Sequence, residues 1–396
     1  MHFSSRIPDG ITENAIARRL RTLRAEGVEL LDLTEANPAR AGLAHPDETL
    51  YAALTSASSC FYEPLPRGLP ATREAIVGYY AADGISVDPE HLHCTASSSE
   101  AYSMLFKLLC DAGDGVCIPQ PSYPLFSWLA ALDAITIQPY RLRYGSDDTW
   151  SIDMTSLEMA LDNRTRAVII VNPSNPAGNY LRSDEFRILD SLCARRGIAL
   201  IIDEVFWDYP LNNGSQAGGC ALRQRSAGAE GICLRFTING LSKSLGLPQM
   251  KLGWILSEGE ARTRDAALAR LDIIADSYLT VSTPVMHAAA TLLARRPLMQ
   301  NAIRERCICN LRQAMKILGP AILPVSGGWN AVVALPENTD EEAAAEILLR
   351  TRHVYLHPGD LFDFSDGRYF VISLLPDPQL FRRAMQRLLA FLSGLE

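Results

Sequence analysis

The alternation of short apolar runs with longer helix-length segments is the feature that most constrains the fold of this chain. Residues 167–171 (AVIIV) and 198–202 (IALII) are apolar at every position. Strands of this kind are expected where both faces of a sheet are covered by other elements. Residues 184–196, which separate the two runs, are predicted to form a helix. Strands that alternate with helices of this length predict βα units and a mostly parallel sheet.

The same alternation extends over most of the chain. Further strands are predicted at residues 91–95, 115–119, 135–142, 232–236 and 253–256, and further helices at residues 11–26, 123–132 and 154–161. After residue 260 helices dominate as far as residue 318, and a shorter β/α segment follows. We therefore predict an α/β fold. Its large domain, residues 47–285, has a mostly parallel sheet flanked by helices, and a smaller α+β domain is made from residues 1–46 and 286–396.

Length and composition are those of a globular protein. The 396 residues exceed one ordinary core, 48% of them are apolar and 21% are charged. The formal net charge of −8 argues against a nucleic-acid partner or an anionic membrane surface. No apolar run approaches the roughly 20 residues needed to span a bilayer, and residues 1–8 have no signal-peptide core. We therefore expect a cytoplasmic protein.

Cysteine and histidine positions give no sign of a metal site. The nine cysteines are scattered, and their odd number without a secretory signal predicts reduced thiols. Cys307 and Cys309 are too close together for a usual zinc pair, and no partners follow at ligand spacing. His91 and His93 share one face of a predicted strand, where a structural role is favoured over metal binding.

Polar groups follow several predicted strands at the edge where ligands bind in open parallel sheets. Ser97, Ser98 and Ser99 lie between a strand and the next helix. Their backbone N–H groups and hydroxyls would form an anion site at a helix N-terminus. An ordinary serine N-cap is the alternative, and the triplet by itself favours the cap.

Two further polar groups end consecutive strands. Asn175 lies between two prolines in the loop of residues 172–178, after the strand at 167–171. Such a rigid loop can hold an amide at a fixed place, although a plain βα turn is the alternative. Asp203 ends the strand at 198–202 and could neutralise a buried cation such as a protonated ring nitrogen, or it could be a cap.

A lysine stands in the segment of residues 242–254, which reads SKSLGLPQMKLGW. Lys243 lies on a tight loop between two predicted strands, where a solvated lysine is not expected. A desolvated lysine can form a Schiff base with a carbonyl cofactor. Because Asn175 and Asp203 lie at strand ends of the same domain, the three side chains could face one pocket.

The residues 172–178 (NPSNPAG), 203–206 (DEVF) and 242–254 resemble, in order and spacing, the motifs of fold type I pyridoxal-phosphate (PLP) enzymes. More closely, the chain is similar over nearly its whole length to the aspartate-aminotransferase superfamily of class I and II aminotransferases. Each motif is weak singly, but together they are very specific. The resemblance implies the PLP-dependent transferase fold type I, PLP as cofactor, and a homodimer with shared sites.

The resemblance also implies a role for each matched residue. Lys243 would carry the Schiff base and, once released, move a proton as general acid and base. Asp203 would keep the ring nitrogen protonated, and Asn175 would donate a hydrogen bond to the ring oxygen. Tyr123 would stack on the ring, with a core aromatic as the alternative. The other implied cofactor contacts are Ser97, Ser98, Ser99 and Lys251 at the phosphate, Ser242 beside the lysine, and Tyr62, similar to a tyrosine that reaches the neighbouring subunit's phosphate.

Four positions depart from the family pattern. Phe206 stands where the family usually has a tyrosine that donates to the ring oxygen. Lys251 replaces a phosphate-binding arginine and cannot make a bidentate contact. Gly240 replaces a frequent serine. Val371, two residues before Ser373, stands where the family has the arginine that binds the substrate carboxylate.

The usual carboxylate contact is therefore predicted to be missing. Arg368 is three positions before Val371 and would point to the opposite face of the strand. Arg6 or Arg40 could take its place, or neutral donors could hold the substrate. Arg40 and Asn37 belong to a loop that borders the substrate in the family, but a solvated Arg40 is the favoured alternative.

A PLP-dependent aminotransferase is the leading hypothesis for function. It would move an amino group between an amino acid, or a related amine, and a keto acid in a two-step, ping-pong reaction. A PLP-dependent lyase, cyclase, decarboxylase or amino-acid oxidase is the main alternative, because Phe206 and Val371 affect how a substrate lies over the ring. A PLP-sensing transcription regulator is disfavoured by the net negative charge and by a chain that starts with the small-domain helix. The residues do not identify the amino donor or acceptor.

Overall fold

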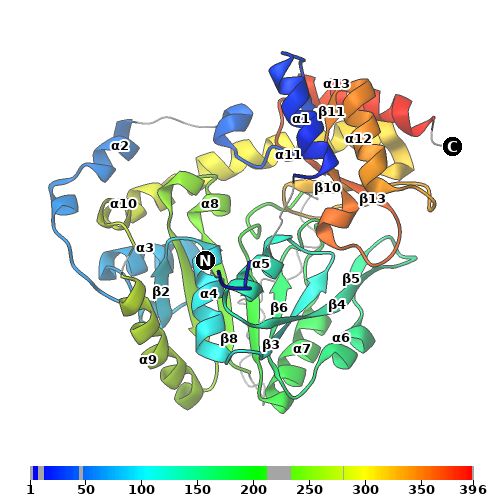
Figure 1. Cartoon of the computed structure of the whole chain (residues 1–396). Coiled ribbons are helices and arrows are strands. Elements are labelled where there is room, and N and C mark those ends of the chain that lie inside the picture. Colours follow the sequence, from blue (N-terminus) through cyan, green and yellow to red (C-terminus); the bar gives the residue numbers. More distant parts are fainter. Residues whose placement is uncertain (1–2, 8–12, 44–47, 212–232, 280, 395–396) are drawn as a thin grey trace.

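The computed structural model describes residues 3–7, 13–43, 48–211, 233–279 and 281–394. Within these residues, one sheet contains eight strands (Figure 1). Their spatial order is β2 (Leu92–Thr95), β9 (Gly253–Glu258), β8 (Arg235–Gly240), β7 (Ala199–Asp203), β6 (Thr165–Val171), β3 (Gly115–Gln120), β4 (Thr136–Tyr144) and β5 (Trp150–Ile152). The strands from β8 to β4 pair in parallel, whereas β9 and β5 run antiparallel to their neighbours. The predicted mostly parallel sheet is confirmed.

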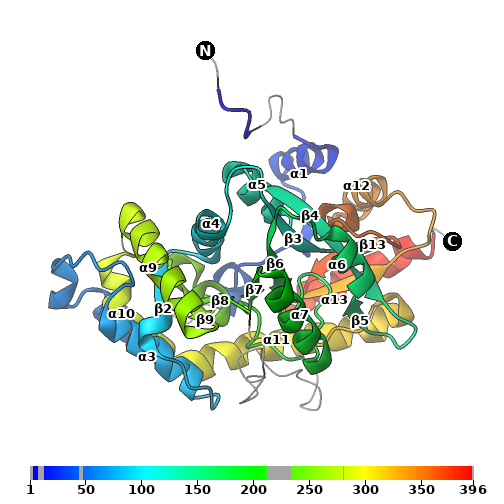
Figure 2. The ribbon, with the colours of Figure 1, turned by 90° about the horizontal axis from the view of Figure 1, so that it is seen from below.

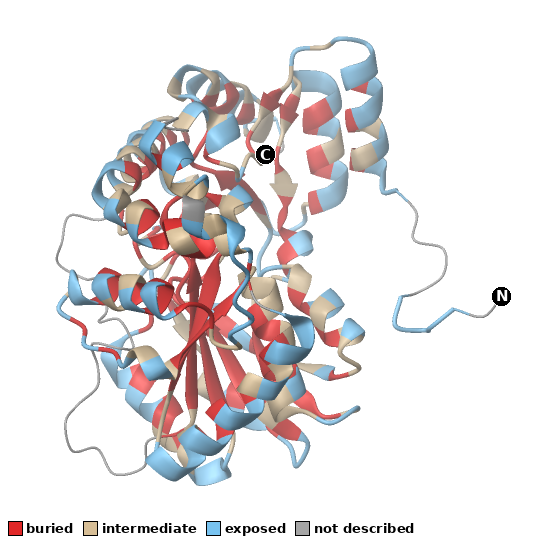
Figure 3. Cartoon of the chain, turned by 90° about the vertical axis from the view of Figure 1, so that its left-hand side faces the viewer, coloured by how far each residue is buried: buried red, intermediate tan, exposed pale blue. Residues whose placement is uncertain are grey.

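Helices cover both faces of this sheet. Successive strand residues point to opposite faces, so Ile169 and Ile170 belong to two different buried clusters. The helices in the first cluster are α4 (Ser98–Leu109), α5 (Leu125–Leu132) and α9 (Ala261–Tyr278), and those in the second are α6 (Met154–Ala160) and α7 (Ser183–Arg196). Figure 2 shows α4 and α5 on one side of the sheet and α7 on the other. Figure 3 shows the buried strands between them, which explains their continuous apolar sequences.

The helix α7 illustrates how local sequence sets these elements. Asp184 and Glu185 lie in its first turn and Arg195 and Arg196 in its last, as the helix dipole favours. Glu185 also accepts a hydrogen bond from the backbone N–H of Arg182, 3.0 Å away, before the helix starts. The helix ends at Gly197, whose φ of 64° is left-handed.

A third buried cluster lies at the β2 edge of the sheet. It joins β2 and β9 to the helices α2 (Glu48–Leu54), α3 (Pro70–Ala81) and α10 (Thr283–Ala294). Trp254 is fully buried there and donates from Nε1 to the hydroxyl of Tyr80 at 2.9 Å.

A smaller α+β unit packs against the carboxyl edge of the large sheet, at the top of Figure 1. Its strands form two sheets, an antiparallel one in the order β10 (Asn330–Ala334), β13 (Tyr369–Ser373), β12 (His357–Pro358), and a parallel pair of β1 (Leu31–Asp32) with β11 (Val354–Tyr355). Its core also contains side chains of α1 (Ala15–Ala25), α12 (Glu341–Arg352), α13 (Pro378–Leu392) and the long α11 (Arg296–Leu318). The α/β class with a smaller α+β part is therefore confirmed, and the domain boundaries at 47 and 285 stay a prediction.

Several predicted elements have different ends in the structure. The N-terminal helix predicted at 11–26 is α1, Ala15–Ala25, and the strand predicted at 135–142 is β4, Thr136–Tyr144. Part of the strand predicted at 232–236 lies outside the described residues, and β8 begins at Arg235. No helix in the described parts of the chain is long and apolar enough to cross a membrane.

Candidate active site

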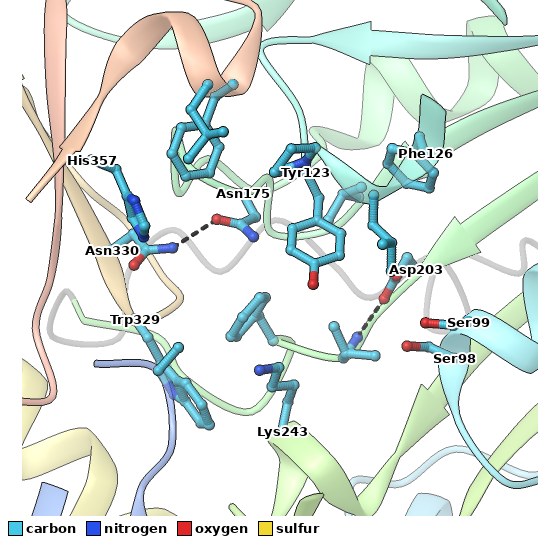
Figure 4. Close-up of a pocket in the computed structure, with 18 of the residues that line it drawn as sticks. Ser98, Ser99, Tyr123, Phe126, Asn175, Asp203, Lys243, Trp329, Asn330 and His357 are labelled. Carbon is cyan, nitrogen blue, oxygen red and sulfur yellow. Dashed lines mark hydrogen bonds between the residues drawn. The ribbon is translucent and has the colours of Figure 1, made fainter. Parts of the chain in front are cut away.

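A cavity of about 360 Å³ lies between the carboxyl ends of the parallel strands and the smaller unit (Figure 4). Ligand sites are expected at this edge of an open parallel sheet. Of the residues singled out from the sequence, those that line the cavity are Ser98, Ser99, Tyr123, Asn175, Asp203, Phe206 and Lys243. They come from the start of α4, the segment just before α5, the loop after β6, the end of β7 and the loop that follows it, and the short helix α8 (Leu241–Ser244).

The backbone around Lys243 is held at the cavity by hydrogen bonds that other side chains donate to it. The buried hydroxyl of Tyr209 donates to the carbonyl oxygens of Lys243 at 2.7 Å and Ser244 at 3.0 Å. Gln300 donates from Nε2 to the carbonyl of Ser244 at 3.0 Å. Burial lowers the pKa of Lys243, and the negative charge of Asp203 opposes this shift. A lowered pKa makes the neutral, nucleophilic amine easier to form.

Aromatic rings surround the end of the lysine side chain. Its Nζ lies 5.3 Å from the ring centre of Trp329 and 5.7 Å from that of Phe206. The two rings meet edge to face with their centres 5.3 Å apart. They contribute to the burial that lowers the pKa of the lysine.

Asp203 is a buried carboxylate at the end of β7. Its Oδ2 accepts a hydrogen bond from the hydroxyl of Tyr102 at 2.9 Å, and its Oδ1 accepts one from the backbone N–H of Val205 at 3.0 Å. Burial raises the pKa of Asp203 to about 6, although both hydrogen bonds and Lys243 act in the opposite direction. The carboxylate is therefore costly to keep charged unless a cation comes close to it.

Asn175 is held from the opposite wall of the cavity. Asn330, the first residue of β10, donates from Nδ2 to the Oδ1 of Asn175 at 2.7 Å. The loop that carries Asn175 is braced internally, because the N–H of Gly178 donates to the carbonyl of Ser174 at 2.8 Å and the N–H of Ser174 to the carbonyl of Asn179 at 2.9 Å.

The three serines at residues 97–99 have different roles in the structure. Ser97 is the N-cap of α4, and its hydroxyl accepts from the backbone N–H of Glu100 at 3.1 Å. Ser98 and Ser99 form the first turn of the helix and line the cavity. Backbone N–H groups and the helix dipole at this end favour an anion.

Seven of the predicted site residues are not among the described residues that line the cavity, namely Ser97, Ser242, Lys251, Tyr62, Asn37, Arg40 and Val371. Arg40 is 72% exposed and pairs with Glu35, Nε to Oε2 at 3.0 Å, as the solvated alternative expects. Tyr62 is 58% exposed. Lys251 is exposed in a left-handed turn with φ 51°.

Val371 also does not line the cavity. It is buried in β13, between Val332 of β10 and His357 of β12. Ser373, two residues on and so on the same face of the strand, does line the cavity. Arg368 precedes β13 and faces a different surface pocket.

Sequence reasoning missed several lining residues, among them Tyr102, Phe126, Trp329, Asn330 and His357. Tyr102 could have been found, because it is four residues after Ser98 and so lies on the same helix face. Trp329, Asn330 and His357 come from the smaller unit, and only the packing of the two units brings them to Lys243 (Figure 4). Burial lowers the pKa of His357, so its imidazole is neutral near pH 7.

The described residues that line the cavity include two basic side chains, Lys243 and His357. No group of three metal-ligating side chains occurs in the parts of the chain that the structure describes. The arrangement thus offers a buried amine, a buried acid, a fixed amide and a helix N-terminus around one space. Such a set can bind a flat, anionic carbonyl compound and move protons at its edge.

Comparison with known proteins places the chain in a family. The family model of class I and II aminotransferases matches residues 29–388. The chain is 27% identical to the glutamate-pyruvate aminotransferase AlaA of Haemophilus influenzae, covering 94% of this chain and 92% of that protein. It is 26% identical to an alanine aminotransferase of Mycobacterium tuberculosis, covering 93% and 87%. A solved structure of alanine aminotransferase from Pyrococcus furiosus has the same fold, with a TM-score of 0.84, 23% identity, and coverage of 99% of this chain and 100% of that one.

The matched residues run through both units of the structure, from just before β1 into α13. The similarity therefore covers the whole cavity and every element that builds it. The chain belongs to the class I and II aminotransferase family, with the fold type I architecture, and is a transferase of the PLP-dependent aminotransferase type.

Proposed function

We propose that this chain binds PLP through Lys243 and moves an amino group between an amino acid, or a related amine, and a keto acid. The observation that carries the proposal is the meeting of Lys243, Asp203 and Asn175 at one cavity. In the net reaction the donor's amino nitrogen and the two electrons of its α C–H bond go to the acceptor's carbonyl carbon. The acceptor's carbonyl oxygen leaves as water, and a water molecule supplies the oxygen of the new carbonyl on the donor's carbon.

The side chains at the cavity fit this cofactor. Asp203 is a buried acid, and a protonated ring nitrogen beside it would offset the cost of burying its charge. Ser98 and Ser99 at the N-terminus of α4 suit a phosphate. Tyr123, which lines the cavity and is 47% exposed, would cover one face of the ring. When bound, PLP supplies an electron sink for the carbon from which a proton is removed.

Lys243 is assigned two tasks at its Nζ atom. It would hold the cofactor covalently, for which a lowered pKa and a fixed backbone are suited. Once displaced by the substrate's amine, Nζ would take a proton from the substrate carbon and return it as general acid. Tyr209 and Gln300 would keep the short helix in place during both tasks. The adjoining Ser242 and the exposed Lys251 are assigned to the cofactor by the family pattern, Lys251 at the phosphate.

The substrate side of the cavity is lined by neutral groups. Asn330, His357 and Ser373 supply polar atoms there, and Val371 stands where the family pattern has an arginine. We infer that the substrate carboxylate is held by neutral donors or by residues outside those that line the described cavity, with Asn37 and Arg40 as candidates from the neighbouring loop. The names of the relatives make alanine, glutamate and pyruvate the first substrates to try.

A homodimer is part of the proposal. Phe61 and Tyr62, adjacent in sequence, are 72% and 58% exposed. Aromatic residues are enriched at protein interfaces, and this exposed pair is a candidate for one. Tyr62 would then reach the phosphate in the partner subunit, as the family pattern implies.

Absorbance of the reconstituted enzyme tests this function. The protein with PLP should have a visible band that bleaches with alanine or glutamate and returns with pyruvate. A band that no amino donor converts would contradict transamination. Product formation that needs no keto acid would instead favour a lyase, cyclase, decarboxylase or oxidase.

The lysine assignment has its own test. Lys243→Ala should lose the visible band of the covalently held cofactor. Lys316→Ala is the matched control, because it removes an exposed lysine on α11 that does not line the cavity and should keep the band. An unchanged band in Lys243→Ala would refute the assignment.

A further inference from the structure

We propose that Asn330 is a positioning residue that fixes the direction of the Asn175 amide and, through it, the protonation of the lysine-bound cofactor. The inference rests on the proposed function, in which Asn175 donates to the ring oxygen of PLP. It adds a residue that the sequence motifs did not suggest and that comes from the smaller unit rather than from the large sheet.

The contact itself sets the direction of the amide. Asn330 donates from Nδ2 to the Oδ1 of Asn175 at 2.7 Å, which uses the oxygen of Asn175 as acceptor. The Nδ2 of Asn175 is the end that remains for the cavity. Figure 4 shows this hydrogen bond as a dashed line, with the nitrogen of Asn175 turned toward the space between Tyr123 and Lys243. A side-chain amide without such a partner could present either its oxygen or its nitrogen.

The backbone holds the two asparagines at this separation. The carbonyl of Gly178, three residues after Asn175, accepts hydrogen bonds from the N–H groups of Gly327 at 2.9 Å and Ser326 at 3.2 Å. Asn330 then begins β10 and is paired in register with Ser373 of β13. The Asn175 loop and the start of β10 are therefore tied together within a few residues of the side-chain contact.

The direction of Asn175 matters more here because of Phe206. Phe206 lines the cavity beside Lys243 but has no hydroxyl to donate. A donor at the ring oxygen draws negative charge away from the nitrogen that joins lysine and cofactor, so it lowers the pKa of that nitrogen. With no hydroxyl at position 206, the Asn175 amide carries more of this effect, and an amide turned the other way would present an acceptor and raise the pKa.

The test is the pH midpoint of the visible band in the holoenzyme, measured for Asn330→Ala, Asn175→Ala and the double variant. Asn330→Ala should raise the midpoint by roughly 0.4 to 1 pH unit, the size expected for loss of one hydrogen bond. Asn175→Ala should raise it at least as much. In the Asn175→Ala background, Asn330→Ala should add nothing, because its partner is gone.

Further variants guard against a purely structural explanation. Asn330→Asp keeps the size but can only accept, so it should turn the Asn175 amide around and raise the midpoint even if Asn330→Ala folds poorly. Asn301→Ala changes an exposed asparagine on α11 and should leave the midpoint unchanged. Thermal unfolding identifies variants that have lost their fold.

The outcomes separate the inference from the proposed function. If Asn330→Ala and Asn330→Asp fold and have the wild-type midpoint, the positioning role is refuted. It is also refuted if the effect of Asn330→Ala persists in full without Asn175. If the protein forms no visible band with PLP, or if Lys243→Ala keeps it, the proposed function itself fails.

Discussion

The hydroxyl of Tyr102 donates to Oδ2 of Asp203 at 2.9 Å, so the carboxylate proposed to face the cofactor nitrogen is anchored from α4. The same helix carries Ser98 and Ser99 at its N-terminus, one turn away. One helix therefore positions both the carboxylate and the phosphate ends of the proposed PLP site. The distance between the two ends is set by a rigid element rather than by a loop.

We expect Tyr102→Phe to weaken PLP binding about tenfold or more, because it removes a hydrogen bond to a buried charge. The ring still packs against Phe106 and Phe126, so the fold should be kept. Fluorescence titration of the apoenzyme with PLP measures the dissociation constant. Wild-type affinity in a folded Tyr102→Phe variant would contradict the anchoring role.

Asp203→Asn should stabilise the apoenzyme at neutral pH while it weakens cofactor binding. Burial raises the pKa of Asp203 from 3.8 to about 6. The protonated carboxyl of folded Asp203 contributes to stability below pH 4, and this contribution is lost as the pH rises through about 6. The difference between the pKa values of 3.8 and about 6 corresponds to roughly 3 kcal/mol of folding free energy. Denaturant unfolding should give a more stable variant at pH 7.5 and equal stabilities near pH 4. A variant less stable than wild type at pH 7.5 would contradict this sign.

The fold and the reactive centre could be predicted because both depend on local sequence. The apolar strands at 167–171 and 198–202 are recognisable by themselves, and Asn175 and Asp203 follow them directly. Lys243 lies between two strands that pair with each other. Parallel strands place their carboxyl ends at one edge, so the sequence order was enough to group these three side chains.

The side of the cavity that the smaller unit forms could not be predicted in the same way. Trp329, Asn330 and His357 reach the cavity because the small antiparallel sheet packs over the edge of the large one. That packing depends on contacts between segments more than 100 residues apart in sequence, such as Asn330 with Asn175. The ends of elements also shifted, since β4 continues to Tyr144 through its pairing with β5.

Tyr209→Phe should slow the reaction more than its loss of stability explains. The change removes the hydroxyl that holds the carbonyls of Lys243 and Ser244, at a cost of about 1 to 2 kcal/mol. Tyr140→Phe is a matched control, because that buried hydroxyl donates to the carbonyl of Ile169 at 2.8 Å and not to α8.

The two tyrosine variants should lose similar stability in denaturant unfolding. Only Tyr209→Phe should reduce the rate at which an amino donor bleaches the visible band, since only there does Lys243 gain freedom to move. Equal bleaching rates in the two variants would mean that the hydroxyl of Tyr209 has a structural role alone.

Gly178→Ala should destabilise the protein by at least about 2 kcal/mol and disturb the proposed PLP site. Gly178 has a φ of 73°, and an added Cβ would lie 2.7 Å from Cγ1 of Val325 and 2.8 Å from the carbonyl oxygen of Gly327. Gly197→Ala is the control, because Gly197 has a similar φ of 64° with nothing within 4 Å, so it should cost only about 1 kcal/mol.

The two alanine variants differ in whether the added Cβ meets a close neighbour. Comparing them therefore measures the effect of the close contact between the Asn175 loop and the segment before β10. Denaturant unfolding measures the difference in stability, and the visible band of the holoenzyme reports the site. In Gly178→Ala the loop must move away from Val325 and Gly327, which lengthens the contact between Asn175 and Asn330. The pH midpoint of the band should therefore rise in Gly178→Ala and stay at the wild-type value in Gly197→Ala. Equal stabilities and equal midpoints in the two variants would show that this approach does not hold the site together.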